Sequence, residues 1–335
     1  MGEEAARLPR DGAAVLRGDT RRTSMRDIAR LDESPEGGYG RLLHRQFVHK
    51  MAASEVLILG GEEVLPDLWR FSFEIPRGHV ANGYPVAKQV PLLLGLELVR
   101  QSGIAVAHFA ESIPLDWKFL LRSIAFSWAA SAPTYTPFEP FRGTLDVELT
   151  SRRFRGGVVS GLMAHVRLAS QGTEMASGSG DIDFLPPKTY RALRRASSGL
   201  LTRSVDSPLL HTEVAPNALT ATLGLDTDDP FIFDHDSDHV PGMLLAKAAI
   251  HAHQTVTRGS ACEGIRMQCH RFAELHLTVR VDSRQDGPSL STTRFTQNGD
   301  VVAEVTCISA SNQASLRYRD RRESTPGVPA EEEAR

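Results

Sequence analysis

Glu97, Arg100 and Gln101 interrupt an otherwise apolar run, "VPLLLGLELVRQSG" at residues 90–103. Their spacing places all three on one face of a helix, and the apolar surroundings predict that this face is buried. Burial raises the pKa of a carboxyl group towards the range of a general base, whereas a nearby arginine opposes that shift and can bind phosphate. The alternative is an internal Glu–Arg pair that only satisfies itself. We expect Glu97 to accept a proton, and Arg100 and Gln101 to contact substrate.

Two further polar groups can contact a substrate. "HDSDH" at 235–239 carries two histidines four residues apart, which is compatible with a divalent metal. His and Asp residues before a helix more often cap it, form hydrogen bonds or contact substrate, so we expect His235 and His239 to contact substrate without a metal. They are also the next candidates for the proton acceptor if Glu97 is not that group. His49 and Lys50 form either an exposed strand end or a phosphate contact.

Pro241 and Gly242 open a second apolar run, "VPGMLLAKAA" at 240–249. Backbone N–H groups at a buried helix start stabilise a developing oxyanion, and a glycine allows close approach of a carbonyl; a simple turn is the alternative. Lys247 lies inside this run and requires an anion, either an acid from the other half of the chain or a phosphate. No Ser-His-Asp or Cys-His pattern is discernible, so we do not expect a covalent enzyme intermediate.

The composition argues against several classes of protein. The 335 residues are 41% hydrophobic, enough for two domains with buried cores, and the formal net charge of -3 argues against binding nucleic acid. The run around Glu97 contains charges, so we expect no membrane span. Three cysteines without a secretory signal favour a reduced, cytoplasmic setting. Cys262, Cys269 and His270 lack the spacing of a zinc site, and we expect neither metal nor cofactor.

An internal repeat centres on the two apolar runs. Without a gap, "VPLLLGLE" at 90–97 aligns with "VPGMLLAK" at 240–247. Upstream, "SEVLI" at 54–58 has its expected counterpart in "TEVAP" at 212–216. This repeat predicts that the chain consists of two units with the same architecture.

Each unit combines strand patterns with one apolar helix. Alternating stretches at 68–75 and 219–226 precede the helices, and strand-like runs at 157–184 and 273–310 follow them. In the last run, the Asn-Gly step of "QNGD" at 297–300 predicts a hairpin turn. A helix that is apolar nearly all round must be buried on most sides, most simply by an antiparallel sheet that curves around it. We therefore predict an α+β protein with a double hotdog fold.

The central helices are expected from Leu92 to His108 and from Met243 to Val256. Both ends of the chain mix charged residues and glycine without a sustained period, which predicts solvated tails. A double hotdog is complete as a monomer, with a homodimer as the alternative. The predicted organisation is a tail at 1–40, a first unit at 41–185, a connector with a short helix at 186–208, a second unit at 209–315 and a charged tail at 316–335.

Four motifs in this order resemble the A-factor biosynthesis proteins, the tandem-hotdog synthases of gamma-butyrolactone-type signalling molecules in actinomycetes. They are "HRQFVHKMAASEVLI" at 44–58, "VPLLLGLELVRQSG" at 90–103, "PPKTYRALRR" at 186–195 and "FDHDSDHVPGMLLAKAA" at 233–249. The resemblance implies an acyltransferase that moves a 3-oxoacyl group from acyl carrier protein to a hydroxyl of dihydroxyacetone phosphate. The ester product is a precursor of a butenolide.

The resemblance also implies roles for the site residues. Glu97 would take the proton from the attacking hydroxyl, and Arg100 would orient the acceptor. Lys247 would meet the acceptor phosphate or the carrier's phosphopantetheine. The arginine-rich segments at 151–157 and 190–195 either dock the acidic carrier protein or form a solvated basic face.

The two units depart from the family's pattern in opposite ways. The family's Glu, followed three residues later by Arg, is complete in the first unit, whereas the second has Lys247 and Ile250. The glycine after the proline is present in the second unit, whereas the first has Leu92. The helix motif also resembles that of 3-hydroxyacyl carrier protein dehydratases. The alternatives are therefore a hotdog dehydratase or thioesterase on carrier-bound acyl chains, or a partly degenerate acyl-binding or regulatory protein.

Overall fold

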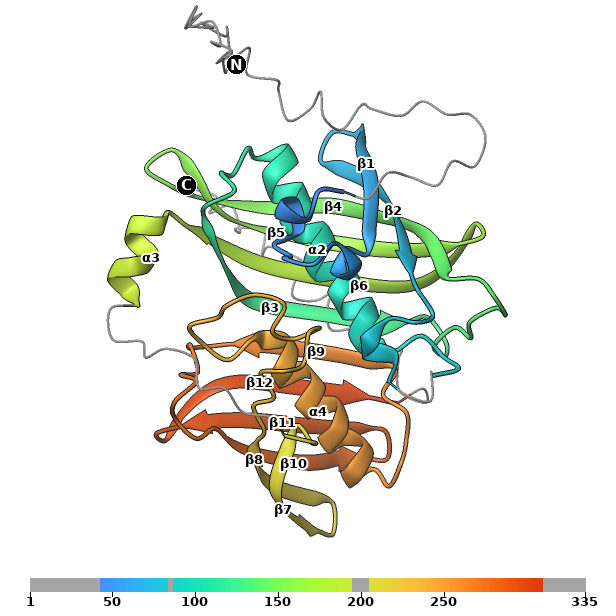
Figure 1. Cartoon of the computed structure of the whole chain (residues 1–335), viewed down its shortest axis with the longest axis vertical. Coiled ribbons are helices and arrows are strands. Elements are labelled where there is room, and N and C mark those ends of the chain that lie inside the picture. Colours follow the sequence, from blue (N-terminus) through green and yellow to red (C-terminus); the bar gives the residue numbers. More distant parts are fainter. Residues whose placement is uncertain (1–42, 84–86, 195–204, 310–335) are drawn as a thin grey trace, which may run out of the picture.

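The computed structural model describes residues 43–83, 87–194 and 205–309. Within these residues, twelve strands form one antiparallel sheet, and two long helices lie against it (Figure 1). The order of strands is β1-β2-β4-β5-β6-β3-β9-β12-β11-β10-β8-β7. The tails predicted at 1–40 and 316–335 lie outside the described residues.

The sheet consists of two halves with the same internal order, joined where β3 pairs antiparallel with β9. The strands of the first unit are β1 (Ile58–Leu65), β2 (Leu68–Ile75), β3 (Lys118–Trp128), β4 (Phe141–Arg155), β5 (Val158–Ser170) and β6 (Thr173–Leu185). The strands of the second unit are β7 (Leu209–Ala215), β8 (Ala218–Leu223), β9 (Gly264–Cys269), β10 (Arg280–Gly287), β11 (Leu290–Gln297) and β12 (Asp300–Ile308). The predicted double hotdog is confirmed.

Each half of the sheet packs against one apolar helix. Helix α2 spans Leu92–Ala110, and α4 spans Gly242–Val256, so both predicted helices are confirmed to within two residues at each end. Helix α2 is apolar and long enough to cross a membrane, but 89% of its apolar window is buried inside the protein. Its hydrophobicity is that of the core helix of a hotdog unit.

Glycines bring α2 close to the sheet. A Cβ at Gly95 of α2 would lie 2.2 Å from the ring of Phe126 in β3. On the sheet side, a Cβ at Gly178 of β6 would lie 2.6 Å from Val99. These close contacts fix the height of α2 above β3 and β6, and therefore the position of the polar residues on the same helix.

The hairpins before the two helices, β1–β2 and β7–β8, align in a register that differs from the expected one. The pairing of "SEVLI" with "TEVAP" is wrong, because residues 53–55 form a short 3₁₀-helix and β1 begins only at Ile58. The hairpins instead align "EVLPD" at 63–67 with "EVAPN" at 213–217. Asp67 and Asn217 then occupy the same turn position with nearly equal positive φ angles, 65° and 63°. Asp and Asn tolerate this left-handed conformation better than other non-glycine residues.

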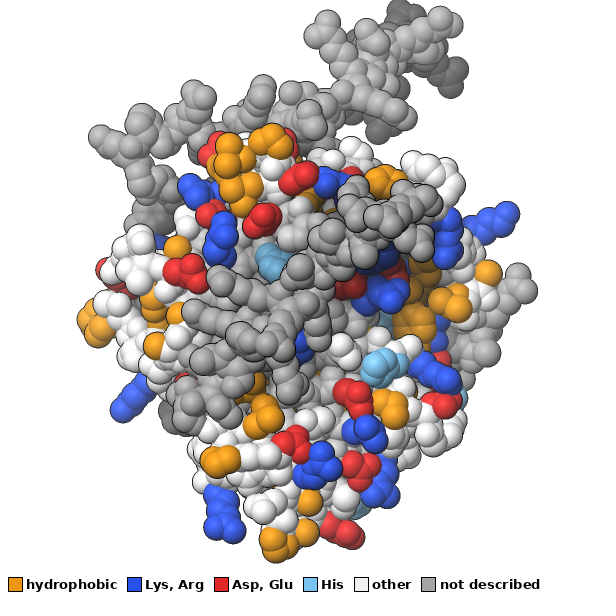
Figure 2. Space-filling view, turned by 180° about the vertical axis from the view of Figure 1, so that it is seen from behind, with side chains coloured by type: hydrophobic (Ala, Val, Ile, Leu, Met, Phe, Trp, Pro, Cys, Tyr) orange, Lys and Arg blue, Asp and Glu red, His pale blue; other side chains and the backbone are white. Residues whose placement is uncertain are grey.

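Shorter elements surround the sheet. The first unit has 3₁₀-helices at Arg45–Val48 (η1), Ala53–Glu55 (η2) and Val80–Asn82 (η3). Helix α3, Pro187–Leu193, lies in the part of the predicted connector that the structure describes. On the face of the molecule seen in Figure 2, Lys and Arg side chains are intermixed with Asp and Glu.

Candidate active site

A cavity of about 590 Å³ opens between the two units, with residues of β3 and the end of β9 in its wall. Every predicted site residue lines it except Gln101 and Lys247. The residues from the first unit are His49, Lys50, Glu97 and Arg100, and those from the second are His235, His239 and Gly242. The cavity thus combines the middle of α2 with the start of α4.

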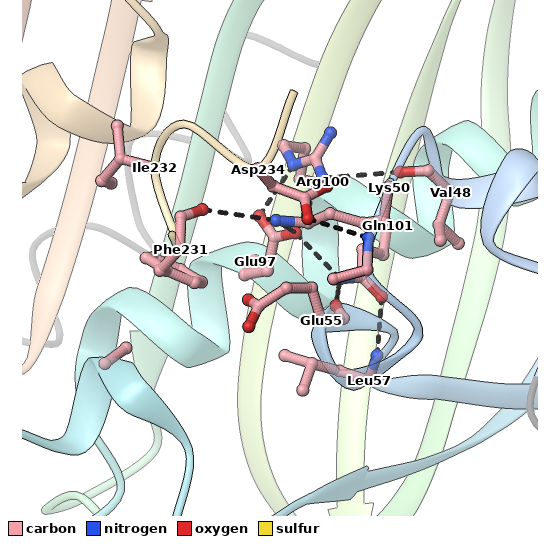
Figure 3. A network of polar contacts seen from close by, with 12 residues as sticks. Val48, Lys50, Glu55, Leu57, Glu97, Arg100, Gln101, Phe231, Ile232 and Asp234 are labelled. Carbon is pink, nitrogen blue, oxygen red and sulfur yellow. Dashed lines mark hydrogen bonds and ion pairs between the residues drawn. The ribbon is translucent and has the colours of Figure 1, made fainter. Parts of the chain in front are cut away.

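Glu97 lies at the floor of the cavity in contact with two cations (Figure 3). Arg100 donates from Nε and Nη2 to the two carboxylate oxygens, both at 2.7 Å. The Lys50 Nζ lies 3.4 Å from Oε1, and the side chain of Glu97 is only 1% exposed. Glu97 therefore accepts from or pairs with both cations, and Asp234 of the second unit adds a further negative charge near Arg100.

The ion pair decides the protonation of Glu97. Burial by itself would raise the pKa of Glu97, but the charges of Arg100 and Lys50 and the hydrogen bonds from Arg100 and Gln101 lower it to about 2. A carboxylate with such a low pKa is a weak base at neutral pH. The sequence-based expectation that burial would make Glu97 a general base therefore loses its physical basis, because the opposing charges outweigh desolvation.

Gln101 lies beneath Glu97 rather than in the cavity, which corrects its expected role as a substrate contact. Its Nε2 donates to Glu97 Oε1 at 2.8 Å and to the Glu55 carbonyl at 2.7 Å. Its Oε1 accepts from the Leu57 N–H at 2.9 Å. The side chain is fully buried, so it joins α2 to the segment before β1 and holds the carboxylate of Glu97 in place.

Two side chains after η1 reach the cavity, and neither lies at an exposed strand end. Lys50 is 6% exposed, and its Nζ also reaches the Phe231 carbonyl at 3.4 Å. His49 Nε2 lies 3.0 Å from Nε2 of the buried His108, whose Nδ1 lies 2.7 Å from the Ile113 carbonyl. Burial, with His108 and Arg100 nearby, lowers the pKa of His49 to about 3, so this imidazole is neutral.

The loop before α4 closes the network from the second unit. Besides the Phe231 carbonyl, it contributes Asp234, whose carboxylate accepts from the backbone N–H groups of Met51 and Ala52 at 2.6 and 3.0 Å (Figure 3). His235 follows Asp234 and lines the cavity, with its ring 3.9 Å from that carboxylate. Burial and the charge of Arg100 lower the pKa of His235.

Helix α4 begins at the cavity. Pro241 is its N-cap, and the amides of Leu244 and Leu245 both bond to the Pro241 carbonyl. The N–H groups of Gly242 and Met243, in the first turn, have no acceptor within the helix, as helix geometry requires. A Cβ at Gly242 would lie 3.3 Å from methyl groups of Leu121 and Met267, so a larger residue would crowd this wall. The arrangement suits an oxygen that develops negative charge.

His239 forms a pair with the preceding residue. Its Nδ1 lies 2.7 Å from Oδ1 of Asp238. The same oxygen accepts from the Tyr190 hydroxyl of α3 at 2.7 Å, and Arg194, directly after α3, donates from Nε to Oδ2 at 3.3 Å. Hydrogen bonds from His239 and Tyr190 lower the pKa of Asp238 despite its partial burial, so Asp238 is a carboxylate.

Lys247 lies outside the cavity, which corrects its expected role. Its Nζ bonds at 2.6 Å to Asp229, an acid of its own unit, and its side chain is 39% exposed. The structure thus pairs Lys247 with an acid of the same unit and not with one from the other unit. Position 247 occupies the same place in α4 as Glu97 in α2, but the two charges face different surroundings.

Two other kinds of chemistry, metal binding and attack by a cysteine, can be compared with the described residues. Among the described residues, no cluster of three or more His, Cys, Asp or Glu side chains has a geometry that could hold a metal ion. Cys269 lines the cavity, but burial raises the pKa of its thiol to about 12. A thiol that stays protonated is a poor nucleophile.

Sequence reasoning missed the residues that hold His239. Asp238 was visible as a neighbour of His239, but its orientation was not. Tyr190 and Arg194 are four residues apart in the "PPKTYRALRR" motif, which places them on one face of a helical turn. That spacing was the available signal, but it does not reveal which loop the turn contacts.

A family model described as the A-factor biosynthesis hotdog domain matches residues 32–186 and 200–310. Together these two ranges cover most of the chain. The chain belongs to the A-factor biosynthesis family. The earlier resemblance is thereby confirmed, and the two matched ranges contain the two units of the sheet.

Relatives of this A-factor family chain are enzymes by name. A protein of Streptomyces virginiae named 2-oxo-3-(phosphooxy)propyl 3-oxoalkanoate synthase is 29% identical over 246 residues, which cover 69% of this chain and 83% of that protein. A protein of Streptomyces griseus with the same name is 28% identical over 298 residues, covering 74% and 95%. Among solved structures, an acyl-ACP thioesterase from Bacteroides thetaiotaomicron is 12% identical with a TM-score of 0.47, covering 72% of this chain and 98% of that chain.

Proposed function

We propose that this protein is an acyltransferase that moves a 3-oxoacyl group from acyl carrier protein to a hydroxyl of dihydroxyacetone phosphate. The product is a phosphorylated 3-oxoacyl ester, used for gamma-butyrolactone or butenolide signalling molecules. The names of its Streptomyces relatives describe such an ester, in which the 2-oxo-3-(phosphooxy)propyl group is the acceptor and the 3-oxoalkanoate is the acyl group.

The observation that carries this proposal is the placement of Lys50 and Arg100 at one end of the cavity that α4 enters with its N-terminus. The bonds of Arg100 to Glu97 use Nε and Nη2, and within the described residues no acceptor is recorded for Nη1. A phosphate that binds there gains a charge-assisted hydrogen bond from Arg100 and the charge of Lys50. The cavity thus has a place for the anionic end of the acceptor.

The start of α4 supplies the second requirement of acyl transfer. When the acceptor hydroxyl attacks the thioester carbonyl, negative charge develops on the carbonyl oxygen. The N–H groups of Gly242 and Met243 and the positive end of the helix dipole stabilise that charge. The carbon–sulfur bond then breaks, the carrier's thiolate leaves, and the proton of the hydroxyl ends on the sulfur.

Glu97 has a positioning role in this proposal. It holds Arg100 through two hydrogen bonds and neutralises one of two neighbouring cations. Without it, Arg100 and Lys50 would repel each other in a buried place. The proton acceptor is therefore another group in the cavity.

The carrier protein is part of the proposal, but the arginine-rich segment at 151–157 gives it little support. Arg152 contacts Asp67 and Glu111, and Arg153 contacts Asp181 and Asp183. These intramolecular acids compete with an acidic partner for the same guanidinium groups. The state as monomer or homodimer and the cytoplasmic location remain predictions.

One assay tests this function. Purified protein is incubated with 3-oxoacyl carrier protein and dihydroxyacetone phosphate, and the products are identified by mass spectrometry. The ester is the expected product. Free 3-oxo acid instead would indicate a thioesterase, dehydration of a 3-hydroxyacyl substrate a dehydratase, and absence of turnover an acyl-binding protein.

Arg100→Gln sharpens the assay. We expect a rise of the KM for dihydroxyacetone phosphate by about 10²-fold, because the charged donor to phosphate is lost (about 2.7 kcal/mol). The control is Arg70→Gln, which removes an ion pair with Asp146 on the surface and should leave the KM unchanged. Equal KM values for the two variants would contradict the assignment of Arg100 to the phosphate.

A further inference from the structure

Asp238 receives hydrogen bonds from several sides, and this fixes its carboxylate. Tyr190 and His239 both reach Oδ1 at 2.7 Å, and Arg194 reaches Oδ2. Arg194 also donates to the Asp238 carbonyl at 2.6 Å and is itself held by Glu274. The carboxylate is thus anchored by a helix that precedes the second unit and by the segment after β9.

This anchoring decides which nitrogen of His239 carries the proton. An ionised carboxylate only accepts hydrogen bonds, so Nδ1 of His239 must be the donor. In the neutral imidazole, Nε2 then has the lone pair. The ring packs edge-on against Phe272 at a centroid distance of 4.9 Å, and the side chain is 32% exposed and lines the cavity.

The other titratable groups of the cavity are less suited to accept a proton. Glu97 is held as a carboxylate by Arg100 and Lys50, and its pKa is about 2. The pKa of His49 is about 3, so it binds a proton only in strong acid. His235 lies 3.9 Å from Asp234, beyond hydrogen-bond distance, and that carboxylate already binds two backbone amides.

We propose that His239 is the general base of the acyl transfer, and that Asp238, held by Tyr190 and Arg194, is the positioning residue that fixes its tautomer. This inference rests on the proposed function for the identity of the acceptor. His239 stands three residues before Gly242, in the loop that leads into α4, so the base and the oxyanion donors line the same cavity close to the helix start.

The step balances without any further reactant. His239 Nε2 takes the proton of the acceptor hydroxyl while the hydroxyl oxygen bonds to the thioester carbon. When the tetrahedral intermediate collapses, the carbon–sulfur bond breaks, and the imidazolium returns the proton to the departing thiolate. Asp238 stays ionised throughout and stabilises the imidazolium in between.

Kinetics of four variants test the inference. His239→Gln should lower kcat by about 10²- to 10⁴-fold, the range for loss of a general base, with a nearly unchanged KM for dihydroxyacetone phosphate. Asp238→Asn should lower kcat as well, whereas Tyr190→Phe removes one of several anchors and should have the smallest effect. In His239→Ala, added imidazole should restore part of the lost kcat. A His239→Gln enzyme with the wild-type kcat would overturn the proposal.

The tautomer supplies a readout that does not depend on any substrate. ¹⁵N NMR of histidine-labelled protein, with His239→Gln for assignment, should show His239 protonated at Nδ1 and bare at Nε2. The Asp238→Asn variant should lose this preference. A proton on Nε2 in the wild type would overturn the dyad. If the wild type shows the expected tautomer but forms no ester, the proposed function fails while the assignment of the dyad stands.

Discussion

Helices α2 and α4 occupy equivalent places in the two units, yet they contribute different parts to the cavity. Helix α2 contributes its middle, where Glu97 holds Arg100, and its first residue is the buried Leu92. Helix α4 contributes its start at Gly242, and its middle carries Lys247, which pairs with Asp229 outside the cavity. The first unit lacks the glycine at its helix start, and the second unit lacks the Glu–Arg pair in its helix middle. This cavity uses neither of those two places.

This complementarity explains why the departures from the family's pattern need not abolish activity. A cavity between two units requires a charged helix middle from one and an open helix start from the other. The equivalent combination, the middle of α4 with the start of α2, carries Lys247, Ile250 and Leu92 instead. Two diverged units therefore provide, within the described residues, the complementary parts of the one asymmetric site that we propose.

The largest expected contrast is in the free energy of unfolding, between a variant that removes the charge of Glu97 in α2 and one that removes the charge of Lys247 in α4. Glu97→Gln leaves Arg100 and Lys50 side by side in a buried place, so we expect the free energy of unfolding to fall by about 3–5 kcal/mol. Lys247→Gln breaks a partly exposed pair and should change it by about 1 kcal/mol or less. Urea denaturation of both variants at pH 7 measures the difference. Similar losses would show that the two pairs are equivalent after all.

Acid should weaken both units through buried histidines. Burial lowers the pKa of His253 in the second unit to about 4, and burial with nearby cations lowers that of His49 to about 3. The unfolded chain binds these protons near pH 6.5, so stability is full above that pH and falls as the pH decreases towards the folded pKa values.

Each of these histidines should add up to about 1.4 kcal/mol per pH unit to the loss between pH 6.5 and 5. Unfolding free energies across this range, for the wild type and for His49→Gln and His253→Gln, measure the two shares separately. If neither variant has a shallower pH dependence than the wild type, the two imidazoles are not buried in the neutral form.

A methyl group at the start of α4 should have the smallest of these effects. In Gly242→Ala the new methyl lies 3.3 Å from Leu121 and Met267, which should shift the first turn and lower kcat by about fivefold, or about 1 kcal/mol. The control is Gly287→Ala, where a Cβ meets nothing within 4 Å. Steady-state rates with saturating acceptor measure the effect, and an unchanged kcat in Gly242→Ala would exclude close approach of substrate to this turn.

The sequence by itself determined the two helices and the repeat, and most of the site residues that it predicted line the cavity. These features depend on local patterns: an apolar helix must be covered by a sheet, and polar residues on one helix face share surroundings. The family resemblance rests on the same motifs. Gln101 was placed on the correct face of α2, but the pattern did not distinguish a cavity wall from a support beneath it.

Only the tertiary structure decided how the charges are balanced. The pKa of Glu97 is the outcome of burial against two cations, and one of them, Lys50, is distant in sequence. Lys247 turned out to pair with Asp229, and His239 with an Asp238 anchored from α3. These results depend on distances of a few ångströms between segments that lie apart in the sequence, such as Lys50 and Glu97. No periodicity along the chain encodes such distances, because Coulomb and hydrogen-bond energies depend on separation in space.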